Sequence, residues 1–392
     1  MFRMAVGHSD DIDVDLALEE VLVACEAGLR GATPRAGLLF ASWTIDHIAV
    51  ARAVRDRYPG IELVGSSTAG EMSSALGLLE DSIELALFAS DVVDVTAGIG
   101  RDLAADPVAA TRNAIRGARS KSELEPALCI VFPNIGGVDP GIVLTTLREE
   151  LGPAVPVLGG GASTRDPIQD PAGTVGKQLF NDEVVEGGVA VLLFSGPLTY
   201  SFGVETGWRG VGPRAVVTSV IDGRIHEIDE RPAAEFFDRY LGTAMTGAPI
   251  ANPLAVYEDA DDGGFYLRTA TNIDRASGDV SVFGPIDAGV TVQLTVAGAD
   301  EIMDGTRASI SEAMRGFPIG NPPEAVLMYS CVVRRFLLGT RAQREIEIVR
   351  ELVGAEVPVA GFYCMGEIAP TPATDGARFH NATVVSVLLG TA

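Results

Sequence analysis

Apolar residues recur along the first 200 positions with two different periods. Runs of strand length lie at residues 4–8, 36–43, 61–65, 83–90, 92–98, 129–133 and 155–159. Apolar side chains at helical spacing lie within residues 13–29, 46–58, 106–119 and 140–151. Asp46 and Asp106 are predicted N-caps, and Pro59-Gly60 is a predicted helix stop. Strands alternating with helices predict a mixed α/β fold whose sheets are flanked by helices.

A unit of strand, helix, strand ending in glycine, polar loop and strand occurs three times at low similarity. Its central segments are Glu62-Leu-Val-Gly-Ser-Ser-Thr-Ala-Gly-Glu71, Pro156-Val-Leu-Gly-Gly-Gly-Ala-Ser-Thr164 and Pro358-Val-Ala-Gly-Phe-Tyr-Cys-Met-Gly-Glu367. The distance from the first strand to the glycine is similar in each case. We therefore predict duplicated strand–helix–strand units that share one architecture.

The chain of 392 residues has the length of two domains. Residues 200–228 predict a connecting β region, and residues 231–242 predict a helix that ends at Gly242. Residues 251–258 and 264–272 are predicted strands, joined by a turn at 259–264. We place the boundary near residue 222, which gives two related modules, 1–222 and 223–392.

Charge and composition narrow the classes of function. Asp and Glu number 53 against 29 Lys and Arg, so the formal net charge is −24. This balance argues against nucleic-acid binding and against docking on anionic membranes. No apolar run of membrane-spanning length and no signal peptide are seen, and the four cysteines form no CxxC pair. We expect a cytoplasmic protein with no zinc site.

Glycine-rich segments after two predicted strands are candidate anion-binding loops. Gly65-Ser-Ser-Thr-Ala-Gly70, with Ser66 and Thr68, and Gly159-Gly-Gly-Ala-Ser163 could direct backbone N–H groups at a ligand. Neither matches a nucleotide-binding motif, and no lysine lies nearby in sequence. The alternative is that these glycines permit a tight turn or a close approach of strands.

Polar residues set among apolar strands form a second candidate. Arg268, Arg335, Glu367 and Asn381 would make a carboxylate-binding set, since a guanidinium pairs with a carboxylate through two hydrogen bonds. The alternative is a buried ion pair of Arg268 or Arg335 with Glu367 that only orients the fold.

Cysteine and histidine allow two further hypotheses. Cys331 or Cys364 could act as a nucleophile with His380 as its base, although a cysteine is more often a small buried apolar residue. The histidines are isolated in sequence, so a zinc site is not expected, but one histidine is sufficient as an axial haem ligand. They are His8, His47, His226 and His380.

Several separated motifs occur in the order found in a known family. The segment from Pro358 to Pro370, followed by Phe379-His-Asn-Ala-Thr383, resembles the C-terminal signature of the FIST sensory-domain family, Gly-Phe-x-x-x-Gly-Glu with a later Asn-x-Thr. Ser330-Cys-Val-Val-Arg-Arg335 and Val64-Gly-Ser-Ser-Thr-Ala-Gly-Glu71 also resemble family segments, and Arg165-Asp166 lie in a comparable loop. The resemblance implies a FIST N-terminal domain over 1–222 and a FIST C-terminal domain over 223–392.

The resemblance implies a bacterial intracellular sensor that binds a small ligand, such as an amino acid or another small carboxylate. No output domain is visible in the sequence, so a signalling protein is the expected partner, and a binding protein is favoured over an enzyme. The alternatives are a haem-binding nitric-oxide sensor and a cysteine-dependent enzyme on a small acyl or amide substrate. No catalytic residue, metal or other cofactor is assigned, and the oligomeric state is open. The expected ligand-binding residues are Arg268, Arg335, Cys331, Gly361, Glu367, Asn381, Thr383, Ser66 and Thr68.

Overall fold

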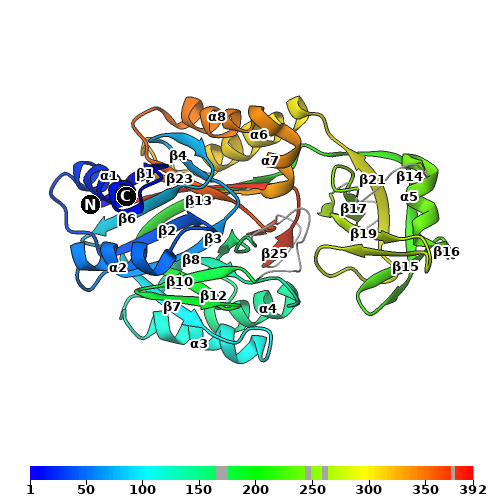
Figure 1. Ribbon diagram of the computed structural model, residues 1–392, viewed down its shortest axis with the longest axis horizontal. Helices are drawn as coiled ribbons and strands as arrows, with labels where there is room; N and C mark the ends of the chain where they lie inside the picture. Colours follow the sequence, from blue (N-terminus) through cyan, green and yellow to red (C-terminus); the bar gives the residue numbers. More distant parts are fainter. Residues whose placement is uncertain (165–174, 243–248, 258–263, 372–375, 392) are drawn as a thin grey trace.

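The computed structural model describes residues 1–392 except 165–174, 243–248, 258–263, 372–375 and 392. Arg165, Asp166 and most of the turn predicted at 259–264 therefore lie outside the described residues. The predicted mixed α/β class with strand–helix–strand repeats is confirmed (Figure 1). Among the described helices, none is long and apolar enough to cross a membrane.

Three sheets of the described chain contain four strands in the same spatial order. Each of these sheets is built around one of the three sequence repeats. In the first unit the order is β1 (Phe2–Ser9), β6 (Ile83–Ser90), β2 (Ala36–Ser42), β3 (Glu62–Thr68). In the second it is β7 (Asp94–Gly100), β12 (Val189–Ser195), β8 (Pro126–Pro133), β9 (Val157–Gly160). In the third it is β13 (Leu198–Glu205), β26 (Val384–Thr391), β22 (Ala325–Cys331), β23 (Val359–Cys364). The last two strands of each list run parallel, and the other pairs are antiparallel.

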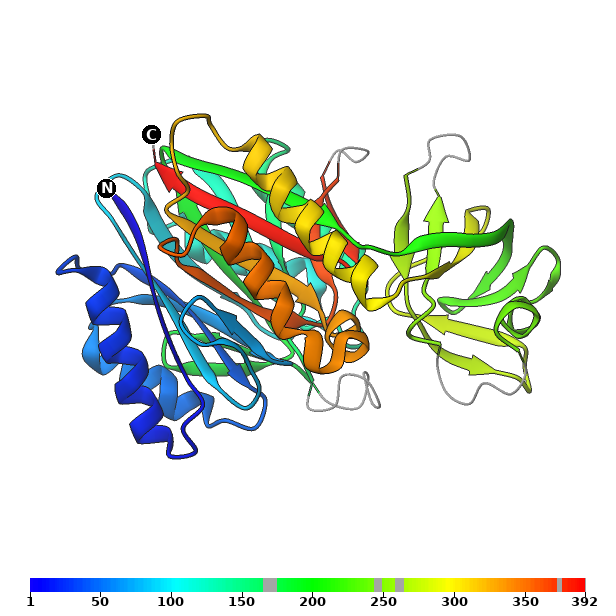
Figure 2. The same ribbon diagram turned by 90° about the horizontal axis from the view of Figure 1, so that it is seen from above.

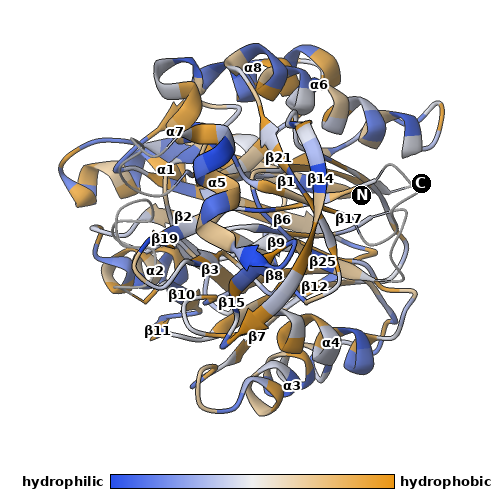
Figure 3. Ribbon diagram, turned by 90° about the vertical axis from the view of Figure 1, so that its right-hand side faces the viewer, coloured by the Kyte–Doolittle hydropathy of each residue, from blue (hydrophilic) through white to orange (hydrophobic). Residues whose placement is uncertain are grey.

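The helices take equivalent places in the three units. Those that pack on the first strand of each unit are α1 (Val14–Leu29), α3 (Pro107–Arg119) and α6 (Ala299–Gly316). Those that connect the parallel strands are α2 (His47–Arg57), α4 (Pro140–Leu151) and, after α7 (Val332–Leu338), α8 (Gln343–Val353). Asp46 and Asp106 cap α2 and α3 as predicted. Figure 3 shows the helices on three sides of the molecule with the strands inside.

A hairpin leaves each unit and extends the sheet of another. The hairpin β4 (Glu71–Ser73) and β5 (Gly77–Leu79) of the first unit pairs with β23 in the third sheet. The hairpin β10 (Lys177–Phe180) and β11 (Glu183–Glu186) of the second unit pairs with β3 in the first. The hairpin β24 (Glu367–Pro370) and β25 (Ala377–His380) of the third unit pairs with β9 in the second. The exchange is cyclic, so no unit completes its sheet alone.

Backbone hydrogen bonds join the three units where their inner strands end. Ala69 N–H donates to the Tyr363 carbonyl at 2.9 Å, and Ser163 N–H donates to the Ser67 carbonyl at 2.8 Å. Met365 N–H completes the cycle by donating to the Gly161 carbonyl at 3.0 Å. In this cycle each unit donates one hydrogen bond and accepts one. We call these three hydrogen bonds the three-bond ring.

One segment has no counterpart in the other two units. Between β13 and α6 the chain builds a separate sheet with one described helix, shown apart from the three sheets in Figures 1 and 2. We call residues 209–296 the inserted subdomain. Its elements are β14 (Arg209–Ile221), β15 (Arg224–Ile228), β16 (Arg231–Pro232), α5 (Ala233–Leu241), β17 (Leu254–Tyr257), β18 (Tyr266–Arg268), β19 (Ala270–Asp274), β20 (Asp279–Val282) and β21 (Thr291–Val296). Residue 222 lies in the turn between β14 and β15, and the domain boundary placed there stays a prediction.

Aromatic rings from all three units meet where the inner faces of the sheets converge. Phe40 and Phe132 lie 5.5 Å apart between ring centroids, and Phe132 and Tyr329 lie 6.0 Å apart. Phe362 contacts all three rings at 4.6 to 5.7 Å. These four residues are fully buried, and such aromatic contacts add to the stabilisation that comes from burial alone.

Equivalent glycines allow the parallel strands to approach in each unit. A Cβ on Gly65 would lie 1.8 Å from the Leu39 carbonyl oxygen, and one on Gly361 would lie 2.0 Å from that of Met328. Gly159 has the same environment, with the Val131 carbonyl oxygen at 2.1 Å. The geometry therefore supports the alternative interpretation, in which these glycines permit a close approach of neighbouring strands. The loop predicted at 65–70 begins later than expected, because β3 continues through Thr68.

Gly361→Ala should destabilise the fold strongly, because the new methyl group would overlap a backbone carbonyl that cannot move aside. We expect the free energy of unfolding to fall by about 3 kcal/mol in urea titrations. Gly117→Ala is the matched control, since nothing lies within 4 Å of its Cβ position in α3, and it should stabilise by up to about 1 kcal/mol. Equal effects of the two substitutions would contradict this explanation.

Candidate functional site

The expected ligand-binding residues fall into separate groups in the structure. Glu367 is fully buried and accepts hydrogen bonds at Oε2 from Thr383 N–H (3.0 Å) and from the Thr383 hydroxyl (2.6 Å). Its Oε1 accepts from the Cys364 thiol at 3.3 Å, and the Cys331 thiol also contacts this carboxyl. Burial raises the pKa of Glu367 to about 7, although its hydrogen bonds partly oppose that rise.

The same position in the other units holds Glu71 and Gln178. The residue after each pairs with an equivalent glycine, since Ile368 faces Gly159, Met72 faces Gly361 and Leu179 faces Gly65. Each of the three side chains then bonds the residue just before the last strand of its own unit. For Glu71 the donor is the Ser82 hydroxyl, and for Gln178 it is Gly188 N–H, at 2.7 Å from Oε1. The Glu or Gln at this position therefore links a hairpin to its own unit in every repeat.

Ser66 and Thr68 lie in the first unit, on the same strand. Thr68 donates its hydroxyl hydrogen to Glu71, and Ser66 donates to the carbonyl of Ser67 at 3.1 Å. His8 contacts the Ser82 hydroxyl at 2.9 Å, and burial lowers its pKa to about 4. Burial also raises the pKa of Glu71 to about 7. All of these side chains are buried. Those of Thr68, Glu71, Ser82 and His8 are linked to one another by hydrogen bonds, so they hold the fold together in this region.

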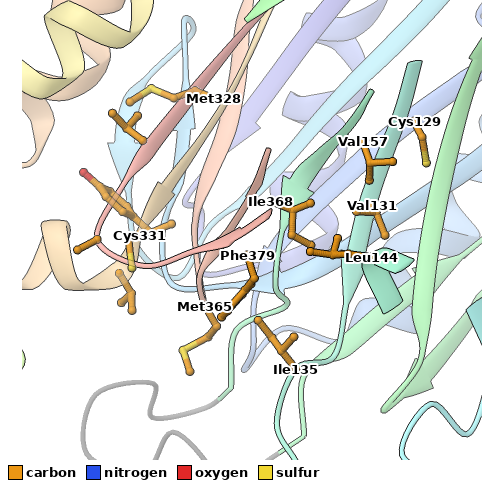
Figure 4. Close-up of a cluster of buried hydrophobic side chains, with 14 of the residues drawn as sticks. Cys129, Val131, Ile135, Leu144, Val157, Met328, Cys331, Met365, Ile368 and Phe379 are labelled. Carbon is orange, nitrogen blue, oxygen red and sulfur yellow. The ribbon is translucent and has the colours of Figure 1, made fainter. Parts of the chain in front are cut away.

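The cysteines lie in buried surroundings, where the Cys331 and Cys364 thiols contact the Glu367 carboxyl. All four are buried, and burial raises the pKa of the Cys331 and Cys364 thiols far above the ordinary value. Figure 4 shows Cys331 in the buried apolar cluster with Met365 and Phe379. His380 bonds the Ala369 carbonyl at 3.0 Å, and burial lowers its pKa to about 4. Since a nucleophile must be a thiolate, these environments do not favour the cysteine chemistry that the sequence left open.

A buried ion pair exists in the C-terminal half, and it joins Arg334 and Glu345. The Arg334 guanidinium is fully buried, donates to Glu345 Oε1 at 2.6 Å and to the Ile302 carbonyl at 2.9 Å, and also donates to the Thr206 carbonyl. Arg335 instead points to the Ala69 carbonyl and pairs with Glu80. Among the described residues Glu367 has no arginine partner, so the predicted alternative of a buried pair of Arg268 or Arg335 with Glu367 is wrong. The sequence contained the right motif but did not distinguish its two arginines.

Arg268 and Asn381 lie where the inserted subdomain meets the hairpin β24–β25. Arg268 donates to the carbonyls of Pro285 (2.7 Å) and Phe379 (3.1 Å). The Asn381 Oδ1 atom accepts from Thr269 N–H at 2.9 Å. Both side chains are buried. The Arg268–Phe379 and Thr269–Asn381 hydrogen bonds therefore connect the inserted subdomain to the motif around residue 380.

The same junction contains a cavity of about 280 Å³ that has three arginines in its wall. Arg148 comes from α4, Arg378 from β25 and Arg268 from β18. The guanidinium carbons of Arg268 and Arg378 lie 4.4 and 4.2 Å from the centre of the same Tyr266 ring. The other described lining residues are Gly141, Leu144, Thr145, Pro285, Gly376, Ala377 and Phe379, so none of the described lining residues is acidic. Sequence reasoning found Arg268 alone. Arg378 stands beside the motif, whereas nothing in the sequence marks Arg148.

Family models match most of the chain. The FIST N domain matches residues 35–231, and the FIST C domain matches residues 233–370. The chain belongs to the FIST family. The two matches meet between residues 231 and 233, within the inserted subdomain. The resemblance stated from the motifs is confirmed.

Two uncharacterized proteins of Mycobacterium tuberculosis, MT0656 and Rv0628c, are similar to this FIST protein. Each is 24% identical over 383 residues, which cover 94% of this chain and 95% of the relative. Among solved structures, cyanuric acid hydrolase from A. caulinodans aligns with a TM-score of 0.41 and 10% identity, over 100% of this chain and 99% of that one. T. maritima PurL complexed with ATP aligns with a TM-score of 0.23 and 13% identity, over 100% and 71%. Both scores are too low to assign a shared fold.

Glu367→Gln should remove one source of pH-dependent stability. The folded-state pKa of about 7 exceeds the ordinary 4.5, so the carboxyl stabilises the fold below pH 4.5 and this contribution is lost as the pH rises to about 7. The loss is on the order of 3 kcal/mol for a fully buried group. The amide should therefore raise the melting temperature at pH 8 and flatten its dependence on pH between 5 and 8.

Gln178→Glu is the reciprocal variant, because it places a carboxyl at the equivalent buried position of the second unit. It should lower the melting temperature at pH 8 more than at pH 5. If both variants follow the wild-type pH profile, the carboxyl of Glu367 does not titrate in this range and the explanation fails.

Arg334→Met and Arg335→Met should differ widely in stability. Removing Arg334 leaves Glu345 buried without its cation, which costs about 3 to 5 kcal/mol. Arg335 and Glu80 form a partly exposed pair, whose loss should cost about 1 kcal/mol or less. Chemical denaturation of both variants measures the difference, and similar losses would show that the buried pair does not carry the stability assigned to it.

Proposed function

We propose that this FIST protein is a sensory protein that binds a small carboxylate ligand in the three-arginine cavity. FIST domains are generally small-ligand-binding sensory domains, and the cavity supplies a chemistry that fits an anionic group. A guanidinium remains charged at all physiological pH values and offers paired N–H donors to a carboxylate. The single observation that carries the proposal is the meeting of three arginines in one cavity of a chain with a net charge of −24.

The cavity wall joins two parts of the molecule. Arg148 and Arg378 belong to the second sheet and its helices, whereas Arg268 belongs to the inserted subdomain. A carboxylate that contacts arginines from both parts gains more when they are close together. Ligand binding would therefore favour one orientation of the inserted subdomain, which is the kind of population shift a sensor requires. A signalling protein that recognises this orientation is the proposed partner.

Binding to the three-arginine cavity should depend on the exposed arginine of α4. Arg148→Gln removes one charge while keeping the size and the hydrogen-bonding ability of the side chain, and we expect at least a tenfold rise in the Kd for a carboxylate. Arg52→Gln, an exposed arginine on α2, is the matched control and should bind as the wild type does. Isothermal titration with a panel of organic and amino acids measures both. If every acid binds the two variants equally, the cavity is not the site.

A further inference from the structure

We infer that the ligand is a monocarboxylic acid with an apolar tail, an inference that rests on the proposed function and names the class of molecule bound. A second cavity, of about 550 Å³, adjoins the three-arginine cavity. The two share Leu144, Arg148, Gly376 and Ala377 in their walls. A Cβ on Gly376 would lie 3.4 Å from Arg148 Cδ, so the arginine stem lies directly against the β25 end of the hairpin. The side chain of Arg148 thus borders both spaces.

Most of the described residues around the second cavity have apolar or small side chains. Apart from Arg148 its described lining residues are uncharged: Leu144, Gly152, Pro153, Ala154, Val155, Pro156, Val157, Tyr200, Phe202, Pro370, Gly376 and Ala377. Tyr200 is half-buried in this wall, and partial burial raises the pKa of its hydroxyl. An ammonium group placed here would meet no described carboxylate, whereas a hydrocarbon chain would be removed from water.

The opposite side of the three-arginine cavity has another chemistry. A cavity of about 500 Å³ there is lined by Asp139 and Asp222, and it shares only Pro285 and Phe379 with the arginine cavity. The Asp139 carboxylate already accepts from Gly141 N–H at 2.8 Å as the cap of α4. The Phe379 ring, packed in the apolar cluster with Leu144 and Ile368 (Figure 4), lines both this space and the three-arginine cavity. The three-arginine cavity thus shares more of its described wall, including Arg148, with the second cavity than with this one.

Two forces would then select the ligand. The guanidinium groups hold its carboxylate, and each methylene buried in the apolar cavity should improve binding roughly fourfold. A charged group at the far end of the tail would lose water and meet no opposite charge among the described lining residues, which should weaken binding.

A series of straight-chain acids tests this inference by isothermal titration of the full chain. Propanoate, butanoate, hexanoate and octanoate should bind with Kd values that fall roughly fourfold per methylene until the cavity is full. The probe 6-aminohexanoate has the length of hexanoate with an ammonium at its end, and it should bind at least tenfold more weakly than hexanoate.

Two variants report on the apolar cavity itself. Tyr200→Asp places a carboxylate in its wall and should reverse the preference, so that 6-aminohexanoate binds better than hexanoate. Tyr240→Asp, on α5 and away from both cavities, is the matched control and should leave the preference unchanged. Ala154→Trp lies on the exposed loop at the rim, does not disturb the core, and should reduce the longest acid that gains affinity. This variant tests the idea even if Tyr200→Asp does not fold.

The outcomes separate the inference from the function on which it rests. If short acids bind in an Arg148-dependent way but chain length has no effect, the apolar tail is refuted and the carboxylate site stands. If 6-aminohexanoate binds the wild type more tightly than hexanoate, the tail enters the cavity with Asp139 and Asp222, and the inference is also overturned. If no acid binds at all, the proposed function itself fails.

Discussion

The fold depends on the cyclic connection of its three units. Each inner strand ends in the three-bond ring, in which the N–H of Ala69, Ser163 or Met365 donates to a carbonyl of another unit. Just after the three-bond ring, each unit continues into a hairpin that adds two strands to the sheet of a neighbouring unit. Because every sheet needs a hairpin from elsewhere, the first two units are incomplete until the third has been made. Stability in such an arrangement belongs to the whole cycle, which contains pairings far apart in sequence.

Local features of the fold could be predicted from sequence because local chemistry determines them. The helix α4 begins and ends where predicted, since Asp139-Pro140 forms its start and Gly152 follows its last residue. The three repeats were visible because Gly65, Gly159 and Gly361 must all lack a Cβ where parallel strands touch. The exchange of hairpins could not be predicted in this way, because it depends on which distant strand edge each hairpin meets. A strand pattern records the faces that are buried but does not record the identity of the neighbour.

The candidate site shows the same division between local and distant information. Glu367 and Thr383 were found as a motif, and the structure explains their pattern as a link between a hairpin and its own unit. Arg268 was found because an arginine inside an apolar strand is unusual. Arg148 could not be found, since it is an exposed arginine on a helix and only the three-dimensional junction gives it a role. Motifs in this chain thus report mainly on what holds the units together, whereas the cavity is formed where the units meet the inserted subdomain.

The buried Arg334 relates that subdomain to the rest of the molecule. Its guanidinium bonds the carbonyl of Thr206, just before the inserted segment, and that of Ile302, just after it. The two segments that lead into and out of the inserted subdomain are therefore both hydrogen-bonded to the Arg334 side chain, which pairs with Glu345 in the interior. The Arg334 bonds form one support of the subdomain, and the hydrogen bond from Arg268 to the Phe379 carbonyl belongs to a second. Arg268 and Phe379 also line the three-arginine cavity. Under the proposed function, a ligand in that cavity would act on the second support, where its binding energy would bias the orientation of the subdomain while the buried ion pair stays intact.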